Sequence, residues 1–469
     1  MRLPTGVLTA LIATCMTAAS LAVANASHAK APDDIYIVWR YVQNITAGNG
    51  WVYNLGEPVN ACTSAVQLLV LTGLALLGCE QATAFVVASG CAIAIASVLL
   101  FLHTRNAQGG WLLPILLGVT AIVLPLHGNT CGLETQLQMA VIVAIWIAWQ
   151  RRRATWFGAL AALAILVRPD TLLFAAGCLV MRPANQQRWS RRELLRGSLA
   201  ASAVLLPWAA FSLQQFGHVL PATLAAKVAQ GQSGWWPTNQ FLRSLQVSLR
   251  DFDTWQLLGS YKPFLILLAV GLAACWRSAT WRPFFAYALA QAIGYALLRV
   301  PFYHWYALPT HMAVALSPFA IAEAITGRGK TSAFGARICV ALLLTSMLSI
   351  HHRERQPLPY QDAGTWIAAN SNPTATVACA EIGVLGVAVW PRSIIDLAGL
   401  VTPRALPSLR RADFTWPLQE PTPDYFVLHD PEWPRLEGNL VDDPRFQAHY
   451  ERVPHTFRAA VAVWQRKQR

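Results

Sequence analysis

Long apolar stretches recur along the first 350 residues of the chain and limit what it can fold into. They run for roughly 14 to 22 residues, and the longer ones match the ~20 residues that a helix needs to cross ~30 Å of hydrocarbon. Hydrophobic residues make up 55% of the sequence and charged residues only 13%, outside the range usual for soluble domains. The sequence therefore predicts a polytopic α-helical membrane protein with about 11 spans and additional membrane-dipping helices.

The apolar stretches stop at residue 350, where the composition changes. The remaining residues are polar, rich in proline and mixed in charge, with short runs typical of β-strands. These runs are TATVACA, SIIDLAG, DYFVLH and AAVAVWQ. We therefore expect a transmembrane module over residues 1–350 and a water-facing, extracytoplasmic α/β domain over residues 351–469.

The net charge of +13 would suit a protein that binds nucleic acid, but the basic residues gather in short loops between apolar runs. Residues 151–153 (RRR) and 185–196 (NQQRWSRRELLR) are examples. Such loops stay on the cytoplasmic side and contact anionic lipids. We therefore expect membrane lipids as partners and no nucleic acid. The nine cysteines show neither a CxxC pair nor the spacing of a zinc site or disulfide framework.

Counting charges orients the chain. With Arg2 and the basic loops inside, residues 5–26 cross outward, and Asp33, Asp34 and the water-facing tail lie on the external face. A cleaved signal peptide is the other interpretation of this first stretch, since it has a basic start and small residues near its end. Its apolar middle is longer than usual for a signal peptide, and many spans follow, so we expect a retained helix.

In two internal regions the apolar runs cannot each form a helix that spans the membrane once. Four apolar runs between residues 62 and 151 are one too many for this orientation, so we expect residues 64–78 to lie along the membrane or dip into it. Residues 154–167 and 171–181 have basic flanks and must form a hairpin. Both arms are short, so the Arg-Pro-Asp turn between them should be sunk below the outer surface, where it can only line a protein cavity.

Unusual polar side chains collect on the external face. They are Asp33, Asp34, Arg40, Glu134, Arg168, Asp170, His218, Lys227, Arg299, Tyr303 and His304. Ionisable groups are costly at membrane depth and therefore indicate a site, although some of them, such as His218 and Tyr303, would also suit helix ends at the headgroups. Carboxylates with cations nearby suit a reaction in which one carboxylate removes a proton while the cations hold a phosphate leaving group.

Several motifs along nearly the whole chain resemble those of a known family. They are DDIYIVWRYVQNITAGNGWVYNLGEPVNACTS from residue 33, GLETQL at 132–137, RPDTLLF at 168–174, FGHVLPATLAAK at 216–227, FYHWYALP at 302–309, and EIGVLG and IIDLAGLVTP in the tail. Their order is similar to that in bacterial polyprenyl-linked-sugar transferases, the arabinofuranosyltransferase-like and mannosyltransferase-like members of the GT-C superfamily. NACTSAVQ departs from the family pattern by losing an acidic residue and an aromatic pair at Asn60, Cys62 and Gln67.

The resemblance implies a membrane glycosyltransferase that moves a sugar, a pentofuranose such as arabinofuranose or a hexose such as mannose, from a polyprenyl-phosphate donor to an envelope glycan, lipid or protein. It implies the bacterial inner membrane, with the site and tail facing the periplasm. The alternatives from the sequence are a flippase or transporter of lipid-linked sugars, and a ligase or polymerase of lipid-linked glycans.

The resemblance also implies roles for individual residues. Asp33 or Asp34, with Asp33 favoured, would be the general base, and the other would orient it or bind a divalent cation such as Mg²⁺ or Mn²⁺. Arg168, Lys227 and Arg40 would hold the donor phosphate. Glu134, Asp170, His218, Tyr303 and His304 would contact sugar hydroxyls or the acceptor.

Overall fold

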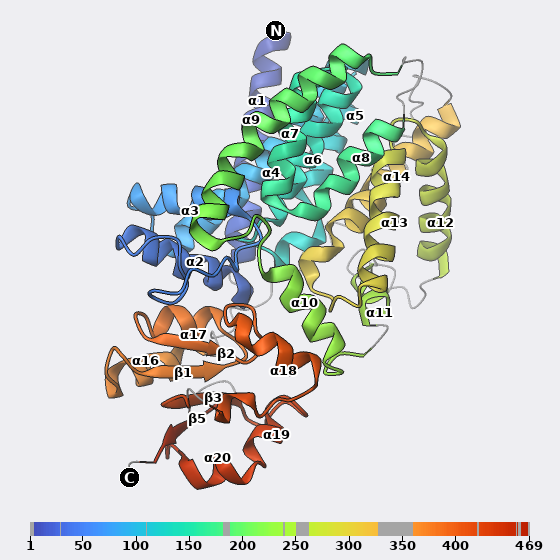
Figure 1. The fold of residues 1–469 in the computed structure, drawn as a ribbon. Helices are drawn as coiled ribbons and strands as arrows, with labels where there is room; N and C mark the ends of the chain where they lie inside the picture. The colour runs from blue at the N-terminus through green and yellow to red at the C-terminus, as the bar shows by residue number, and fades with distance from the viewer. Residues whose placement is uncertain are drawn as a thin grey trace.

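The structure is a computed structural model in which a bundle of helices stands on a smaller α/β domain (Figure 1). It describes residues 4–28, 30–108, 110–181, 188–237, 240–249, 262–326, 360–419, 422–455, 457 and 461–467. The predicted boundary between residues 350 and 351 lies outside these ranges.

The helices of the bundle differ widely in length. They are α1 (Thr5–His28), α2 (Asp33–Thr46), α3 (Ala65–Leu76), α4 (Gln81–Gln108), α5 (Leu112–Ile122), α6 (Thr135–Gln150), α7 (Ala154–Val167), α8 (Leu172–Val180), α9 (Arg191–Phe216), α10 (Thr223–Gln232), α11 (Gln240–Ser248), α12 (Lys262–Arg277), α13 (Arg282–Leu297) and α14 (Leu308–Thr326). Short 3₁₀ turns, η1 (Pro125–Asn129), η2 (Pro169–Thr171) and η5 (His304–Ala307), connect some of them.

In the described part of the chain, four helical stretches are long and apolar enough to cross a membrane. They are Thr5–His28, Gln81–Arg105, Leu112–Asn129 and Arg191–Phe216. The total of about 11 spans stays a prediction. The twelve residues of α3 reach only ~18 Å, too short to cross ~30 Å of hydrocarbon. This length agrees with the expectation that residues 64–78 do not cross.

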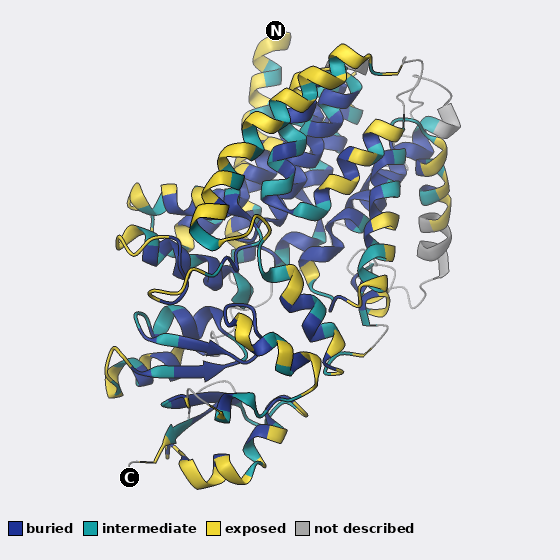
Figure 2. Cartoon of the chain, in the orientation of Figure 1, coloured by how far each residue is buried: buried dark blue, intermediate teal, exposed yellow. Residues whose placement is uncertain are grey.

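The outer helices of the bundle present apolar side chains to their surroundings. Helix α9 carries a row of exposed large residues, namely Leu194, Leu195, Leu199, Leu206, Phe211 and Leu213, and Figure 2 shows its outer face as exposed along most of its length. An apolar surface of this extent is typical of contact with lipid. On its inner side α9 approaches α7 so closely that a Cβ at Gly158 would overlap the carbonyl of Gly197, the small-residue packing common between membrane helices.

The carboxyl-terminal domain is built on one five-stranded sheet, with strand order β2-β1-β3-β5-β4. The strands are β1 (Thr376–Cys379), β2 (Ser393–Asp396), β3 (Tyr425–His429), β4 (Tyr450–Arg452) and β5 (Val461–Arg466). β2, β1 and β3 are parallel, whereas β5 is antiparallel to both β3 and β4. The four strand-like runs of the sequence all contain strands, and only the three-residue β4 had no such signal.

Helices and turns cover this sheet. They are α16 (Gln361–Asn370), α17 (Gly383–Ala388), η6 (Pro403–Ala405), α18 (Leu406–Arg410), η7 (Trp416–Leu418), α19 (Gly438–Val441) and α20 (Pro444–His449). Successive residues of β1 face opposite sides, as in any strand. Val377 and Cys379 belong to the same apolar core as the helical bundle, whereas Ala378 packs with Phe426 and Leu428 on the other side. The sheet and the bundle therefore share one core.

Candidate active site

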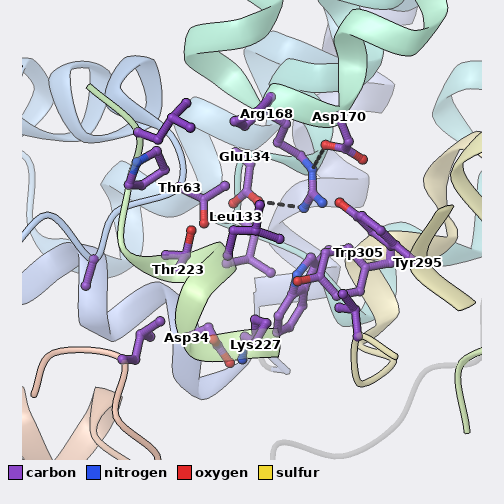
Figure 3. A pocket seen from close by; sticks show the side chains of 18 of the residues that line it. Asp34, Thr63, Leu133, Glu134, Arg168, Asp170, Thr223, Lys227, Tyr295 and Trp305 are labelled. Carbon is purple, nitrogen blue, oxygen red and sulfur yellow. Dashed lines mark hydrogen bonds and ion pairs between the residues drawn. The ribbon is translucent and has the colours of Figure 1, made fainter. Parts of the chain in front are cut away.

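A cavity of about 390 Å³ lies where the helical bundle meets the carboxyl-terminal domain. Most of its wall is apolar, with side chains such as Leu172, Leu173, Leu220, Leu224 and Leu298. Five charged side chains also line it: Asp34, Glu134, Arg168, Asp170 and Lys227. Figure 3 shows these five in two groups, one around Arg168 and the other formed by Asp34 and Lys227.

The first group is a buried ion-paired triad. The guanidinium of Arg168 donates to Glu134 Oε1 at 2.9 Å and to Asp170 Oδ1 at 3.0 Å, and it stands 4.9 Å from the ring centre of Tyr306. The Arg168 side chain is only 2% exposed, so both carboxylates are needed to compensate for removing the cation from water.

The Arg-Pro-Asp turn positions this triad. Helix α7 ends at Val167, and Arg168 takes an extended conformation, as expected for a residue that precedes proline. Asp170 is held in place by Gln291, which donates to its Oδ2 at 2.8 Å. Since Arg168, Pro169 and Asp170 all line the cavity, the prediction that this turn lines a protein cavity between two short helical arms is confirmed, and its depth in the membrane stays a prediction.

Glu134 is positioned by the turn that precedes α6. Gly132 has a φ of +88°, and a Cβ there would come within 2.9 Å of Ile35, so only glycine fits. The side chain of Gln67 donates to the Gly132 carbonyl at 2.5 Å, and the Gly132 N–H donates to Ser89 Oγ at 2.7 Å. Gln67, a departure from the family pattern, therefore helps to hold the turn that carries Glu134.

Asp34 and Lys227 form the second group, and their side chains point toward one another (Figure 3). Burial raises the pKa of Asp34, and the positive charge of Lys227 opposes this shift. Burial would lower the pKa of Lys227, but Tyr303 and Asp34 raise it more, so the ammonium stays charged. Lys227 Nζ also lies 3.8 Å from the ring centre of Tyr303, a favourable cation–π distance.

Helix α10 sets the place of Lys227 through contacts at both of its ends. The Ala222 N–H, just before the helix, donates to the Asn60 carbonyl at 2.9 Å. Near its other end, the Gln230 side chain donates to the Ala398 carbonyl of the carboxyl-terminal domain at 2.8 Å. The position of the lysine therefore depends on the bundle and on the carboxyl-terminal domain together.

Asp33 lies outside the cavity lining. Its two carboxylate oxygens accept hydrogen bonds from the N–H groups of Gly383 and Val384, each at 2.7 Å. Burial raises the pKa of Asp33 to about 6, although these hydrogen bonds act in the opposite direction. Asp33 therefore joins the carboxyl-terminal domain to the start of α2, and its favoured role as the base stays a prediction.

Arg40 also lies outside the cavity lining, and its predicted contact with the donor phosphate stays a prediction. Its Nε donates to the Tyr53 carbonyl at 2.9 Å, and its two Nη groups donate to the carbonyls of Gly386 and Arg392. It is 1% exposed and surrounded by backbone acceptors, so we assign it to the same junction as Asp33.

Of the remaining predicted residues, Tyr303 contacts Lys227 but does not line the cavity. The two predicted histidines, His218 and His304, are exposed. His218 Nδ1 lies 2.6 Å from the Leu220 carbonyl, and His304 lies on η5 with its ring 6.1 Å from that of Phe302. Neither lines the cavity.

Sequence analysis missed several residues of the cavity wall. They are Thr63, Thr223, Tyr295, Trp305 and Tyr306. Trp305 and Tyr306 lie inside the FYHWYALP motif, directly after the predicted Tyr303 and His304. Tyr295 falls within an apolar run and carries no sequence signal.

Among the residues that the structure describes, no group of three or more His, Cys, Asp or Glu side chains could hold a metal ion. A divalent cation at Asp33 or Asp34 therefore stays an untested prediction, and we assign no metal ligands.

The fold is similar to that of ArnT from Cupriavidus metallidurans bound to undecaprenyl phosphate. The similarity covers 98% of each chain, with a TM-score of 0.58 and 13% identity. The chain has the fold of the GT-C glycosyltransferases. A second GT-C structure, arabinofuranosyltransferase AftD from mycobacteria, matches 97% of this chain and 41% of its own, with a TM-score of 0.50 and 15% identity. The predicted resemblance to GT-C proteins is thus confirmed at the level of the fold.

Sequence comparison adds one relative and one family. Over 226 residues the chain is 32% identical to the terminal beta-(1->2)-arabinofuranosyltransferase of Mycobacterium tuberculosis, which covers 42% of this chain and 35% of that protein. The chain therefore matches only about a third of the length of this relative. Residues 349–468 match a family described as a domain of unknown function (DUF8728). The names of the relatives agree with the predicted enzyme class.

Proposed function

We propose that the protein is a membrane glycosyltransferase that moves a sugar from a polyprenyl-phosphate donor to an envelope glycan, lipid or protein, with Asp34 as general base. The observation that supports this proposal is that the side chains of Asp34 and Lys227 point toward one another in a largely apolar cavity. A base and a fixed cation side by side suit a reaction that removes a proton and expels a phosphate.

The reaction balances with these groups. The Asp34 carboxylate takes the proton of an acceptor hydroxyl, and the hydroxyl oxygen forms a bond to the anomeric carbon of the donor sugar. The bond between that carbon and the phosphate oxygen breaks, and the polyprenyl phosphate leaves with the electron pair. Lys227 stabilises the negative charge that develops on the phosphate as the bond breaks.

The two cations have unequal roles in this proposal. Arg168 already faces two carboxylates within 3.0 Å, so an added phosphate would be weakly attracted there. Lys227 is therefore the main phosphate contact, and Arg168 holds Glu134 and Asp170 toward sugar hydroxyls. The leucines of the cavity wall suit the first isoprene units of the donor lipid.

The sugar and the location belong to the same proposal. A pentofuranose such as arabinofuranose is supported by the arabinofuranosyltransferase relative, and a hexose such as mannose is the alternative that the sequence resemblance leaves open. The polyprenyl-phosphate donor is supported by the ArnT complex with undecaprenyl phosphate. A transmembrane module over residues 1–350 would lie in the bacterial inner membrane, with the site and residues 351–469 facing the periplasm.

The test uses the full-length protein in lipid nanodiscs and in sealed vesicles. Polyprenyl-phosphate arabinofuranose and polyprenyl-phosphate mannose, each radiolabelled in the sugar, are supplied with envelope fractions as acceptors. We expect transfer of one of the two labels to acceptor in nanodiscs, and loss of that transfer in Asp34→Asn. Movement of label across the vesicle membrane without transfer would instead identify a flippase, and transfer of whole lipid-linked glycans would identify a ligase or polymerase.

A further inference from the structure

The segment of residues 381–386, EIGVLG, follows β1, includes the first four residues of α17 and contacts α2; we call it the docking segment. Asp33 accepts hydrogen bonds from two of its N–H groups. The Tyr53 hydroxyl donates to the Ile382 carbonyl at 2.6 Å, and Arg40 donates to that of Gly386. Hydrogen bonds from three residues of the bundle therefore hold this one short stretch of the carboxyl-terminal domain.

The two glycines of the docking segment allow this close approach. A Cβ at Gly383 would overlap the backbone carbonyl of Asp33, and a Cβ at Gly386 would overlap the Tyr53 hydroxyl. Neither glycine has a positive φ, so it is the space and not the backbone conformation that requires glycine here. The segment is thus shaped to lie against α2.

Glu381, at the start of the docking segment, is brought beside the second charged group of the cavity. Its carboxyl group interacts electrostatically with Asp33 and Asp34 of α2 and with Lys227 of α10. The other titratable groups that face it are Tyr303 next to η5, Tyr360 before α16, Cys379 of β1 and Asp396 of β2. Among the described residues, no hydrogen bond ties the Glu381 carboxyl to another protein group.

A second loop of the same domain reaches the cavity itself. Asp396, at the carboxyl end of β2, accepts hydrogen bonds from the N–H groups of Ala398, Leu400 and Val401, and Leu400 lines the cavity. The loops that follow the parallel strands β1 and β2 therefore both point at the site, the edge at which parallel sheets usually bind ligands.

We propose that the carboxyl-terminal domain completes the catalytic site, with Glu381 binding a hydroxyl group of the acceptor beside Asp34. This inference rests on the proposed function. The donor lipid has to enter along the leucine-lined wall of the bundle, so the acceptor reaches Asp34 from the side of the carboxyl-terminal domain. Glu381 lies on that side, outside the lining of the cavity and next to the segment that bonds Asp33, and a carboxyl group is a common partner for sugar hydroxyls.

The protonation state of Glu381 determines whether its carboxyl group donates or accepts the hydrogen bond with the acceptor hydroxyl. Burial and the neighbouring Asp33 and Asp34 raise the pKa of Glu381 well above its ordinary value, with Lys227 opposing. Asp33 has its ionised form favoured by two N–H donors, and Asp34 by the ammonium of Lys227. A raised pKa favours the protonated form of Glu381, and in that form it donates a hydrogen bond to an acceptor oxygen.

The experiment compares Glu381→Gln with Glu381→Ala in the full-length protein, using the donor sugar and acceptor that support transfer. Glutamine keeps a neutral donor of the same length, whereas alanine removes it. We expect Glu381→Ala to raise KM for the acceptor about tenfold and to leave KM for the donor unchanged. Glu381→Gln should keep acceptor KM near that of the wild type, because its amide still donates. Glu451→Ala, an exposed acid of the same domain, is the matched control.

Two results would overturn the inference. An unchanged acceptor KM in Glu381→Ala would remove Glu381 from acceptor binding, and a Glu381→Gln variant as impaired as Glu381→Ala would exclude a protonated donor. If Glu381→Ala does not fold, Glu381→Leu takes its place, because leucine is of similar size and has no hydrogen-bonding group. If Asp34→Asn transfers sugar normally, the proposed function itself is wrong. If Asp34→Asn is inactive and Glu381→Ala is normal, only the inference about Glu381 is wrong.

Discussion

Asp33 Oδ2 lies 2.7 Å from the backbone nitrogen of Gly383, a residue 350 positions further along the chain. This hydrogen bond joins the start of α2 to the carboxyl-terminal domain and occupies an acid that sequence analysis favoured as the base. Its neighbour Asp34 lines the cavity instead. The two adjacent acids thus have different places in the structure, one at the junction and one at the site.

The docking of the two parts should be sensitive to Gly383. Replacing it with alanine would push a Cβ into the backbone carbonyl of Asp33, so we expect Gly383→Ala to loosen the carboxyl-terminal domain and reduce transfer. Limited proteolysis in detergent should detect faster release of this domain. Gly294→Ala is the control, since a Cβ there meets nothing within 4 Å. Equal proteolysis of both variants would contradict the docking described here.

The buried triad should dominate the stability of the cavity wall. Arg168→Ala leaves Glu134 and Asp170 without their cation, which we expect to cost about 3–5 kcal/mol in the free energy of unfolding, as for other broken buried pairs. Combining it with Glu134→Gln and Asp170→Asn should recover part of this loss, because the uncompensated charges are then gone. Denaturant titration in detergent measures both.

The pair Arg152–Glu193 offers a control for the triad. It has the same 2.9 Å separation as Arg168–Glu134, but its side chains are 27% and 26% exposed. Arg152→Ala should therefore cost only about 0–1 kcal/mol. A loss as large as that of Arg168→Ala would show that burial is not what makes the triad important.

Activity and stability should respond to pH in opposite directions. Burial raises the pKa of Asp34 above its ordinary 3.8, so kcat/KM should fall as the pH drops through a value above 3.8 and the base takes up its proton. Asp33 has a raised pKa of about 6 in the folded protein. Its contribution to stability is therefore present below pH 3.8 and lost as the pH rises through about 6. Unfolding temperature and kcat/KM across this range measure the two trends, and parallel changes would contradict the assignment.

The orientation in the membrane can be checked with reporter fusions. The basic loops at Arg153 and Arg196 should be cytoplasmic, because positive loops stay inside. A reporter at Arg469 should be external, since the carboxyl-terminal domain lies at the opposite end of the bundle from the amino terminus (Figure 1). A cytoplasmic reporter at Arg469 would move the site to the other face of the membrane.

Much of the site could be predicted from the sequence, because charges at membrane depth are rare and the motifs fall in a family order. Asp34, Glu134, Arg168, Asp170 and Lys227 were all predicted and all line one cavity. The four longest strand-like runs of the tail were also recognised, since β-branched and aromatic residues between turn residues mark strands.

The different positions of Asp33 and Asp34 could not be predicted, because the hydrogen-bond partners of Asp33 lie in the carboxyl-terminal domain and leave no local sequence pattern. Helical periodicity does separate the two acids, because they fall on different faces of α2. Asp33 and Arg40 are seven residues apart and share a face of α2, the face that docks the carboxyl-terminal domain. Asp34, Ile37 and Val38 share the face that lines the cavity.

The central claim is that Asp34, and not Asp33, is the base. Its most direct test is the single-turnover rate of sugar transfer by Asp34→Asn and Asp33→Asn, measured at saturating donor on protein shown to be folded and inserted. Each change keeps the size of the side chain and removes the basic carboxylate. We predict that Asp34→Asn slows transfer by roughly 10²–10⁴-fold, whereas Asp33→Asn lowers the unfolding temperature and has a much smaller effect on the rate. A normal rate in Asp34→Asn, or a loss confined to Asp33→Asn, would contradict this account.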